Sequence, residues 1–517
     1  MHGFPDTQKN SQVNTDYDLV IIGGGINGAG IARDAAGRGY RVCLVEKSDF
    51  GSATSAASTK LIHGGLRYLE HYAFRLVRES LQERAVLLKM APHIIWPMRF
   101  ILPHHKGLRP AWLIRLGLWL YDHLGGRQPV PKSEYLHFKS HPAGALIKSD
   151  FETGFAYSDC WVEDSRLVVL NLRDAERLGA EVFNGTQLVS ASAADDIWHL
   201  ELSSENGPRS ITSKMLVNAA GPWGVDVLQR LKSEQTPTNQ PSAKLRLIKG
   251  SHLIINRKLP SDAAYLLQNA DGRITFLVPY EGEFTLVGTT DVDFHDLPEN
   301  IDISKDEIAY LMEMVNPYLR SPITSDEIVA SYAGVRPLYD DGKGQAAKAN
   351  RDYHLELDNS YGASLLNVFG GKLTTYRRLA ESALSHINQA FGQSAASWTG
   401  TVCLPGGDFG SLGQDGLARK LQQQISDMPD RVALRLVRAY GTDCQMFLGQ
   451  ADKMAALGQD FGYGLSEAEL RYLIDVEYAK TAEDILYRRS KLYLHLDNTA
   501  QQHIADWVKD YIQQGRA

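Results

Sequence analysis

Three glycines near the N-terminus have the spacing of a turn that holds a phosphate. Gly23, Gly25 and Gly28 lie between a short apolar run, Tyr17–Ile22, and an Ala- and Gly-rich segment at 26–38. In a strand–turn–helix unit the first glycine permits the tight turn, and the second lets a pyrophosphate approach the backbone. The third lets the helix pack on the strand, and N–H groups at the helix start bind the phosphates. The spacing therefore predicts a dinucleotide site.

A carboxylate stands where the ribose of such a dinucleotide would lie. The segment Arg41–Glu46 reads as a second buried strand, and it ends in Glu46. A carboxylate at this place accepts hydrogen bonds from a ribose diol and disfavours the 2′-phosphate of NADP. The glycine spacing itself does not choose between NAD and FAD.

Two further segments favour FAD. Ser52–Lys60 supplies a run of hydroxyls suited to a long, extended cofactor, and Gly370–Thr374 lies far away between another apparent strand and helix. The start of that helix and Lys372 would stabilise the negative charge of a reduced flavin; a simple helix cap by Thr374 or Thr375 is the alternative. The cofactor contacts expected beyond the three glycines are Glu46, Thr54, Ser55, Ser58, Lys60, His63, Gly221, Gly371 and Thr374.

These and other motifs resemble one flavoprotein family. They are Ile21–Gly30, Ser58–Leu69, Tyr157–Cys160, Gly288–Asp291, Gly334–Pro337 and Phe369–Arg377. The chain resembles the aerobic FAD-dependent glycerol-3-phosphate dehydrogenases, within the glycine/D-amino-acid-oxidase-like flavoproteins. The resemblance spans about Asp16 to the C-terminal region, and His63–Leu69 is far more specific than the glycine spacing.

The resemblance implies non-covalent FAD and the oxidation of sn-glycerol 3-phosphate to dihydroxyacetone phosphate. A hydride would pass from C2 of the substrate to flavin N5, and the electrons would go on to ubiquinone or a related membrane quinone. By the same resemblance, Arg336 and Lys372 lie close to the C2 oxygen. The residues expected to bind the phosphate, for which the arginine fork is well suited, are Arg67, Tyr68, Thr289 and Arg351, with Thr290 as an alternative to Thr289.

The sequence does not decide which group accepts the hydroxyl proton. His252 and His63 are candidates because imidazole titrates near neutral pH. The alternative for each is a structural histidine that binds backbone or flavin, and this alternative is favoured for His63; a water held by Arg336 is a third candidate.

The elements that must position these residues fall into three parts. A chain of 517 residues is too long for one core, and 44% hydrophobic residues fit a globular protein. We expect an α/β protein with a Rossmann-like FAD-binding domain, an antiparallel-sheet substrate domain and a helical C-terminal domain. The boundaries are a disordered leader at 1–16, the FAD-binding domain at 17–95, 150–240 and 365–390, the substrate- and membrane-facing domain at 96–149 and 241–364, and the helical domain at 408–517.

Periodicity predicts the individual elements. Strand-like runs with Gly, Asn and Asp turns at 245–293 indicate an antiparallel sheet. Helices are expected at 75–90, 163–178, 304–319, 372–388, 466–474 and 481–492. The C-terminal helices carry no catalytic signature, so we expect them to serve dimerisation or to cap the other domains.

Charge and cysteine usage exclude several classes of protein. The formal net charge of -7 disfavours binding to nucleic acid. The four cysteines, Cys43, Cys160, Cys403 and Cys444, form no C-x-x-C pair, so we expect a reducing compartment and no metal site. The first residues lack the apolar segment of a signal peptide.

An aromatic and basic stretch, Trp96–Arg127, predicts attachment to a membrane. It contains Trp112, Trp119 and several basic residues, and its apolar run at 111–121 is too short to span a bilayer. Such a composition suits a helix that lies in the headgroup region. We therefore expect a peripheral enzyme on the cytoplasmic face of the inner membrane. The alternative is a buried helix between domains.

Three rival functions remain. The first is an oxidase that passes electrons to oxygen, and the second is an amino-acid oxidase of the same superfamily. The third is a flavin-containing binding or RNA-modification protein, which the acidic net charge disfavours.

Overall fold

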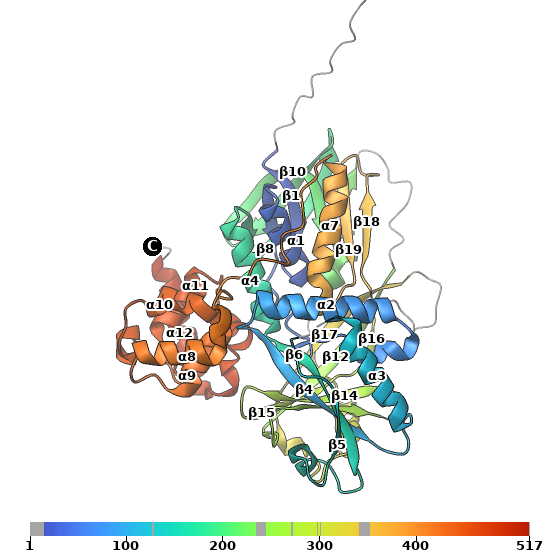
Figure 1. Cartoon of the computed structure of the whole chain (residues 1–517). Coiled ribbons are helices and arrows are strands. Elements are labelled where there is room, and N and C mark those ends of the chain that lie inside the picture. The colour runs from blue at the N-terminus through green and yellow to red at the C-terminus, as the bar shows by residue number, and fades with distance from the viewer. Residues whose placement is uncertain are drawn as a thin grey trace, which may run out of the picture.

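The computed structural model describes residues 15–126, 129–233, 244–269, 272–296, 298–299, 301–340 and 352–515. Figure 1 shows three parts: an upper sheet flanked by helices, a lower sheet, and a group of C-terminal helices at the side. Most of the expected leader lies outside the described residues. Asp16 already belongs to the ordered chain, because its carboxylate accepts a hydrogen bond of 2.8 Å from the backbone N–H of Thr212.

The upper sheet has nine strands and a parallel centre. Its main order is β11-β8-β9-β10-β1-β2-β7, and β19 pairs with both β10 and β18. β1 lies parallel to β2 and β10, and β19 is also parallel to β10. The strands are β1 Tyr17–Ile22, β2 Val42–Val45, β7 Glu181–Phe183, β8 Thr186–Ala194, β9 Ile197–Ser204, β10 Gly207–Asn218, β11 Leu231–Ser233, β18 His354–Asp358 and β19 Ser364–Phe369.

Both faces of this sheet are covered, as the apolar strands predict. Alternate side chains of β1 point to opposite faces. Leu19 and Ile21 pack in one core with helices α1 (Ile26–Gly37), α4 (Asp164–Arg177) and α7 (Tyr376–Ala390). Their neighbours on β1 pack in a second core that includes side chains from β8 and β9. The strand–helix–strand unit predicted from the glycine spacing is thus formed.

The lower sheet has ten strands and is largely antiparallel. Its order is β16-β12-β15-β14-β13-β4-β6-β3, with β17 paired to β12 and β5 paired to β6. The strands are β3 Leu61–Ile62, β4 Ile95–His104, β5 Glu134–His137, β6 Thr153–Val162, β12 Lys244–Ile255, β13 Ala264–Gln268, β14 Ile274–Tyr280, β15 Phe284–Gly288, β16 Val292–Phe294 and β17 Ile328–Asp340. The antiparallel sheet expected at 245–293 is present.

Sheet membership differs from the predicted division in three places. β3 and β6 were placed with the FAD-binding part, but β3 pairs with β6, and β6 pairs with β4 over its whole length, in the lower sheet. β18 was placed with the substrate part, but it pairs with β19 in the upper sheet. Pairing between distant strands decides all three cases, and periodicity along the chain does not contain that information.

The remaining helices lie around and beside the sheets. α2 (Phe74–Met90) crosses between the two sheets, and α3 (Ala111–Leu124) and α6 (Lys305–Val315) belong to the lower part (Figure 1). A short 3₁₀-helix, η1, spans Leu66–His71. The C-terminal part contains α8 Gly413–Gln424, α9 Asp430–Tyr440, α10 Gln445–Leu448, α11 Glu467–Asp475 and α12 Asn498–Gly515.

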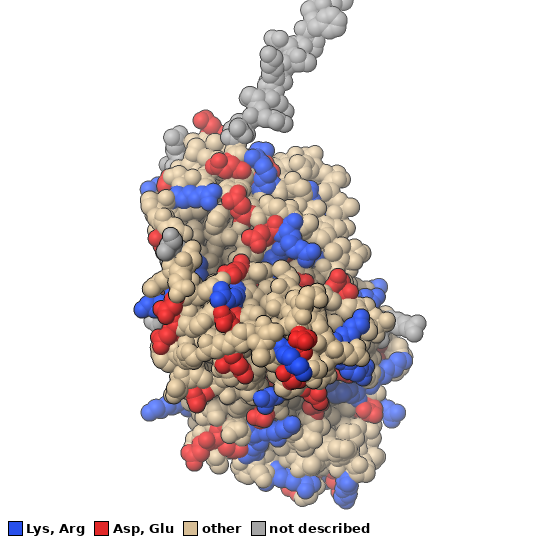
Figure 2. All heavy atoms as spheres, turned by 90° about the vertical axis from the view of Figure 1, so that its left-hand side faces the viewer, with Lys and Arg blue, Asp and Glu red and all other residues tan. Residues whose placement is uncertain are grey.

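The C-terminal part has its own core. The helix expected at 481–492 forms over 482–489, with π-helical geometry at Asp484–Arg489, and a 3₁₀ turn follows at Leu492–Leu494. Figure 2 faces this side of the molecule and shows acidic and basic side chains interspersed, without a continuous patch of either sign.

Candidate functional site

A cavity of about 1210 Å³ lies between the upper and lower sheets. That is larger than the volume most small ligands need, roughly 300–1,000 Å³. Its walls come from the turn after β1, the loop after β2, strand β17 and the segment after β19. The sequence-predicted residues that line it are Gly23, Gly25, Glu46, Thr54, Ser55, Ser58, His63, Arg67, Tyr68, Gly221, His252, Arg336, Gly371, Lys372 and Thr374.

The glycine-rich turn leaves no space for side chains at Gly23 and Gly28. Gly23 has φ +110°, and a Cβ there would lie 2.6 Å from the carbonyl oxygen of Ala219. A Cβ on Gly28 would lie 2.0 Å from the oxygen of Gly23, so Gly28 serves the packing of α1 on β1 and does not line the cavity. Backbone N–H groups at the start of α1 thus lie at the cavity wall, as a pyrophosphate site requires.

Glu46 lies at the end of β2 and holds the glycine-rich turn. Its Oε2 accepts a hydrogen bond of 2.7 Å from Gly24, and its Oε1 one of 2.9 Å from Ser48. Burial raises the pKa of Glu46, although these hydrogen bonds and Lys47 oppose the rise. Beside it, Lys47 Nζ lies 4.2 Å from the ring centroid of Trp223.

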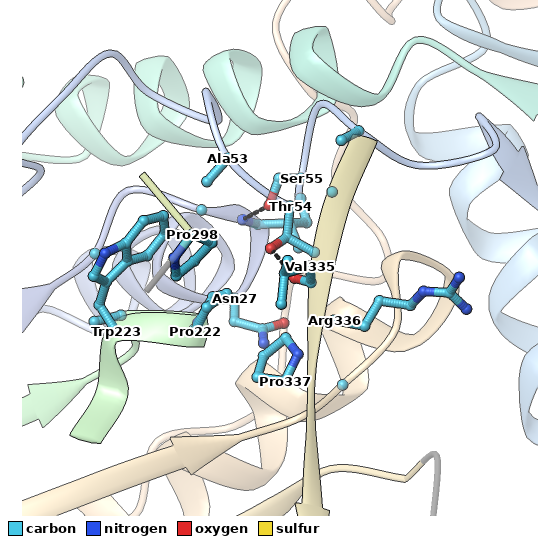
Figure 3. A pocket seen from close by; sticks show the side chains of 18 of the residues that line it. Asn27, Ala53, Thr54, Ser55, Pro222, Trp223, Pro298, Val335, Arg336 and Pro337 are labelled. Atoms are coloured by element: carbon cyan, nitrogen blue, oxygen red, sulfur yellow. Dashed lines mark hydrogen bonds between the residues drawn. The ribbon is translucent and has the colours of Figure 1, made fainter. Parts of the chain in front are cut away.

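The hydroxyl run 52–60 is divided between the cavity and the protein interior. Ser55 accepts a hydrogen bond of 3.0 Å from Ile26, and Thr54 donates one of 2.6 Å to Val335 on β17 (Figure 3). Ser58 lines the cavity, but its hydroxyl donates to Asp164 at 2.7 Å.

Lys60 does not line the cavity. Its ammonium is buried and lies 2.9 Å from Asp164 Oδ2, and it also donates to the oxygen of Ala56 at 3.0 Å. The cofactor contact expected of Lys60 is therefore replaced by an ion pair that fixes the loop onto the start of α4. A buried ammonium needs such a partner, and the sequence alone does not show which carboxylate reaches it.

The segment after β19 reaches back to the glycine-rich turn. Asn27 donates a hydrogen bond of 3.0 Å to the oxygen of Gly370. Thr374 accepts one of 3.3 Å from the backbone of His63. A 3₁₀ turn at Leu373–Thr375 precedes α7, so the helix begins later than the sequence predicts. Asn27 belongs to the glycine motif, but its role as a bridge was missed because only a contact 343 positions away reveals it.

Cationic side chains are part of the cavity lining. In Figure 3 the side chain of Arg336 extends from β17 away from Trp223 and Pro298. Its Nη2 lies 3.0 Å from Asp291 Oδ1 and donates to the oxygen of Thr290 at 3.2 Å. Lys372 Nζ lies 4.2 Å from the ring centroid of Tyr68. Two further lining residues, Asp291 and Arg273, were not singled out from the sequence.

The expected phosphate-binding set is only partly assembled. Arg67 is exposed at the rim and donates to the oxygen of Gly272. Thr289 does not line the cavity, and Thr290 is buried with its hydroxyl bonded to Glu307, so neither threonine fits the assignment as it stands. Arg351 lies outside the described residues.

His252 is neutral in this environment. It is 2% exposed, its Nε2 lies 3.0 Å from Thr59 Oγ1, and its ring stacks on Tyr332 at 4.8 Å between centroids. Burial, with the charges of Lys60 and Arg336, holds the pKa of His252 well below its ordinary value. A histidine with so low a pKa is a weak proton acceptor, which leaves His63 as the more accessible candidate.

The aromatic stretch divides into a buried and an exposed part. Trp96 lies on β4, packs near Trp161 with ring centroids 6.0 Å apart, and has Arg438 above its ring. On α3, Trp112, Leu116 and Trp119 are 69%, 47% and 55% exposed. These three residues contradict the buried-helix alternative, whereas Trp96 does not belong to the exposed face. Arg127 lies outside the described residues.

In the described part of the chain, no helix is both long and apolar enough to cross a membrane.

Two family comparisons match nearly the whole chain. Residues 18–377 match the FAD dependent oxidoreductases. Residues 397–515 match the C-terminal domain of alpha-glycerophosphate oxidase.

Individual proteins match over similar lengths. The chain is 46% identical to a D-erythritol 1-phosphate dehydrogenase from Brucella abortus, over 95% of this chain and 97% of that protein. It is 45% identical to the aerobic glycerol-3-phosphate dehydrogenase of Escherichia coli, over 96% and 98% respectively. A crystal structure of the Bacillus halodurans glycerol-3-phosphate dehydrogenase complexed with FAD superposes with a TM-score of 0.77 at 27% identity, covering 96% of this chain and 91% of that one.

Proposed function

Because the chain belongs to the FAD dependent oxidoreductases and uses FAD, we propose that it oxidises sn-glycerol 3-phosphate to dihydroxyacetone phosphate and passes the electrons to a membrane quinone. The observation that carries the proposal is a single cavity lined both by the glycine-rich turn of the dinucleotide cradle and by the cationic side chains of Arg336, Lys372 and Arg67. A small dianionic substrate needs such cations.

The residues present fit FAD. Gly23 keeps the turn close to the backbone of Ala219 and Ala220, which a Cβ would prevent, and Glu46 lies at the end of β2, where the ribose is expected. Within the described residues, Asn27 Oδ1 and Trp223 Nε1 are buried and have no hydrogen-bond partner, and both residues line the cavity. Polar atoms of this kind are normally satisfied, so a bound cofactor accounts for them.

The chain's own groups have distinct tasks in the reaction. FAD held in this cavity would supply the hydride acceptor, with its N5 as the position that receives the hydride of substrate C2. Lys372 and Arg336 orient the substrate and stabilise negative charge that develops on the C2 oxygen. His63 or a water held by Arg336 takes the hydroxyl proton, because burial and the charges of Lys60 and Arg336 lower the pKa of His252 and disfavour its protonated form. Arg67 and Tyr68 bind the phosphate from the rim.

A second substrate is favoured by one observation. The chain is as similar to the Brucella D-erythritol 1-phosphate dehydrogenase as to the glycerol-3-phosphate dehydrogenases. Both substrates are phosphorylated polyols and differ in length, so the same cations would serve either.

Anaerobic flavin spectra test the substrate. The purified protein is mixed with sn-glycerol 3-phosphate or with D-erythritol 1-phosphate, and the visible flavin bands are followed. Bleaching within seconds by the glycerol compound and slower bleaching by the erythritol compound supports the proposal. The reverse order would assign the longer substrate, and no bleaching by either would reject both.

The exposed face of α3 supports delivery of electrons at a membrane. η1 carries Arg67 and Tyr68 at the cavity, and Tyr72, directly after it, is 81% exposed. Residues of η1 and α3 pack in the same hydrophobic core, so the exposed apolar side chains lie near the substrate site. This arrangement supports our proposal of peripheral attachment at the cytoplasmic face of the inner membrane.

The acceptor is tested on the bleached enzyme. A soluble quinone analogue or air is added, and the return of the flavin bands is timed. Fast return with the quinone and slow return with air supports a dehydrogenase, whereas fast return with air assigns an oxidase.

A further inference from the structure

The loop that carries Glu46 continues into residues held by the C-terminal part. Asp49 accepts hydrogen bonds from both terminal nitrogens of Arg489, at 2.6 Å and 2.7 Å. It also accepts one of 2.6 Å from Arg488 Nε. The carboxylate is thus bound by two adjacent arginines, one of them in the bidentate geometry that gives strong, directional pairing.

All three side chains are enclosed. The exposed fractions are 6% for the Asp49 side chain, 13% for that of Arg488 and 0% for that of Arg489. Although burial alone would raise the pKa of Asp49, Arg489 and Arg488 lower it below its ordinary value. Removal of the carboxylate charge would leave the buried Arg489 guanidinium with only the backbone oxygen of Glu477 as its acceptor among the described residues, which is costly. Arg488 would keep its contacts with Glu483 and Asp484.

The local helix geometry favours this convergence. Neighbouring residues on an α-helix point about 100° apart, yet Arg488 and Arg489 both reach Asp49. They end the π-helical segment Asp484–Arg489, and the N–H of Ser490 bonds to the oxygen of Ile485 at 2.9 Å. π-helical turns are rare and often occur at functional sites.

Phe50 makes a second contact between the same parts. Its ring is fully buried and meets Tyr478 edge-to-face, with centroids 5.1 Å apart. On its other side it presses against the glycine-rich turn, because a Cβ on Gly24 would lie 2.6 Å from Phe50 Cδ1. The N–H of Gly51 then bonds to the oxygen of Gly24 at 3.0 Å.

We propose that the C-terminal part positions the FAD site, with Asp49, Arg488 and Arg489 as positioning residues that hold the segment 46–51. The anchor fixes Glu46 and the turn at Gly24 in the arrangement that binds the adenosine half of FAD. Without it, this segment must be ordered when FAD binds, and affinity falls. The test measures flavin binding and is therefore independent of which polyol phosphate is oxidised.

The experiment compares two carboxylate-to-amide substitutions in the full-length protein. D49N removes the anchor charge. E469Q is the matched control, because Glu469 is buried and held by Arg435 at 2.6 Å and 2.8 Å, entirely within the C-terminal part. Bound FAD is removed, and the Kd for added FAD is measured by quenching of flavin fluorescence at a temperature where both proteins are folded. Melting temperatures are recorded in parallel.

We expect D49N to raise the Kd for FAD about tenfold or more, while E469Q lowers the melting temperature but leaves the Kd within about twofold of the native value. Equal Kd values for D49N and native protein would overturn the proposal. The ion pairs of Asp49 would then serve only the packing of the C-terminal part on the rest of the protein. If D49N does not fold, R488Q keeps the bidentate Arg489 pair and should raise the Kd about threefold. An unchanged Kd in folded R488Q would equally overturn the proposal.

Discussion

The cations at the substrate end of the cavity are held by neighbouring groups before substrate arrives. Arg336 lies 3.0 Å from Asp291, and Lys372 lies over the ring of Tyr68. Such partners fix each side chain in one orientation, which lowers the entropic cost of binding an anion. They also compensate the charges, so that the site tolerates several cations close together.

Lys372→Ala should lower the rate of flavin reduction by sn-glycerol 3-phosphate about 100-fold, the usual loss when one stabilising donor is removed. FAD should stay bound, because Glu46 and the glycine-rich turn are untouched. Stopped-flow absorbance measures the rate, and the flavin-to-protein ratio measures the cofactor. Lys139→Ala, at an exposed lysine, is the control. Reduction at the native rate in K372A would remove Lys372 from the catalytic set.

At the scale of elements, α6 connects the lower sheet to the Thr289–Asp291 turn. Ser304 and Glu307 form a capping box at the start of α6. Glu307 also lies 2.7 Å from Lys249 Nζ and accepts hydrogen bonds of 2.8 Å from Ser251 and Thr290. One carboxylate therefore ties a helix to two segments beside Arg336.

The pKa of Glu307 predicts a pH-dependent contribution to stability. Burial alone would raise this pKa, but hydrogen bonds from Lys249, Ser304, Ser251 and Thr290 lower it from 4.5 to about 2. Because the folded-state pKa is depressed, the contribution is complete above about pH 4.5 and is lost as the pH falls towards 2.

Glu307→Gln should therefore lower the free energy of unfolding by about 2 kcal/mol at pH 7, since charge-assisted hydrogen bonds are lost. The difference from the native protein should shrink when the pH is lowered from 5 to 3. Thermal denaturation of both proteins across this range measures it. A difference that stays constant with pH would show that the carboxylate charge is not responsible.

The exposed face of α3 is expected to bind the membrane. Replacing Trp112, Leu116 and Trp119 with Ser should release the protein from membranes while leaving its melting temperature close to native. The three side chains are exposed, so their loss removes apolar area that a lipid surface would bury, at about 25 cal/mol per Å². Co-sedimentation with liposomes measures binding. Substitution of Val189 and Val225, exposed elsewhere, is the control. Unfolding of the triple variant would instead indicate that α3 is required for the fold.

For the whole molecule, the sequence predicts what is local. The glycine spacing, Glu46 and the apolar runs define the β1–α1–β2 unit, because these features follow from neighbouring residues. Contacts between distant segments were not predictable: the ion pair of Lys60 with Asp164, the bridge from Asn27 to Gly370, and the membership of β6 in the lower sheet. The sequence also did not show that Trp96 lies on strand β4 whereas Trp112 and Trp119 lie on α3. An aromatic and basic composition does not distinguish a strand from the helix that follows it.

The site is assembled from all three parts of the chain. The glycine-rich turn and Gly370–Lys372 come from the upper sheet, Arg336 comes from β17 of the lower sheet, and Asp49 is held by the C-terminal part. A ligand that binds only this assembled form stabilises every part that it requires. FAD should therefore stabilise the C-terminal part as well as the turn that it touches.

Removal of FAD should lower the melting temperature of the whole protein and increase hydrogen exchange in two regions, the segment 46–51 and the helix 484–489. At free FAD about 100 times its Kd, the stabilisation is about 2.7 kcal/mol. Hydrogen exchange measured by mass spectrometry with and without FAD shows which segments are stabilised. In E469Q the protection of 484–489 by FAD should persist, and in D49N it should be lost, because the Asp49 contact transmits it. Protection confined to 46–51 in the native protein would mean that the C-terminal part and the FAD site are energetically independent.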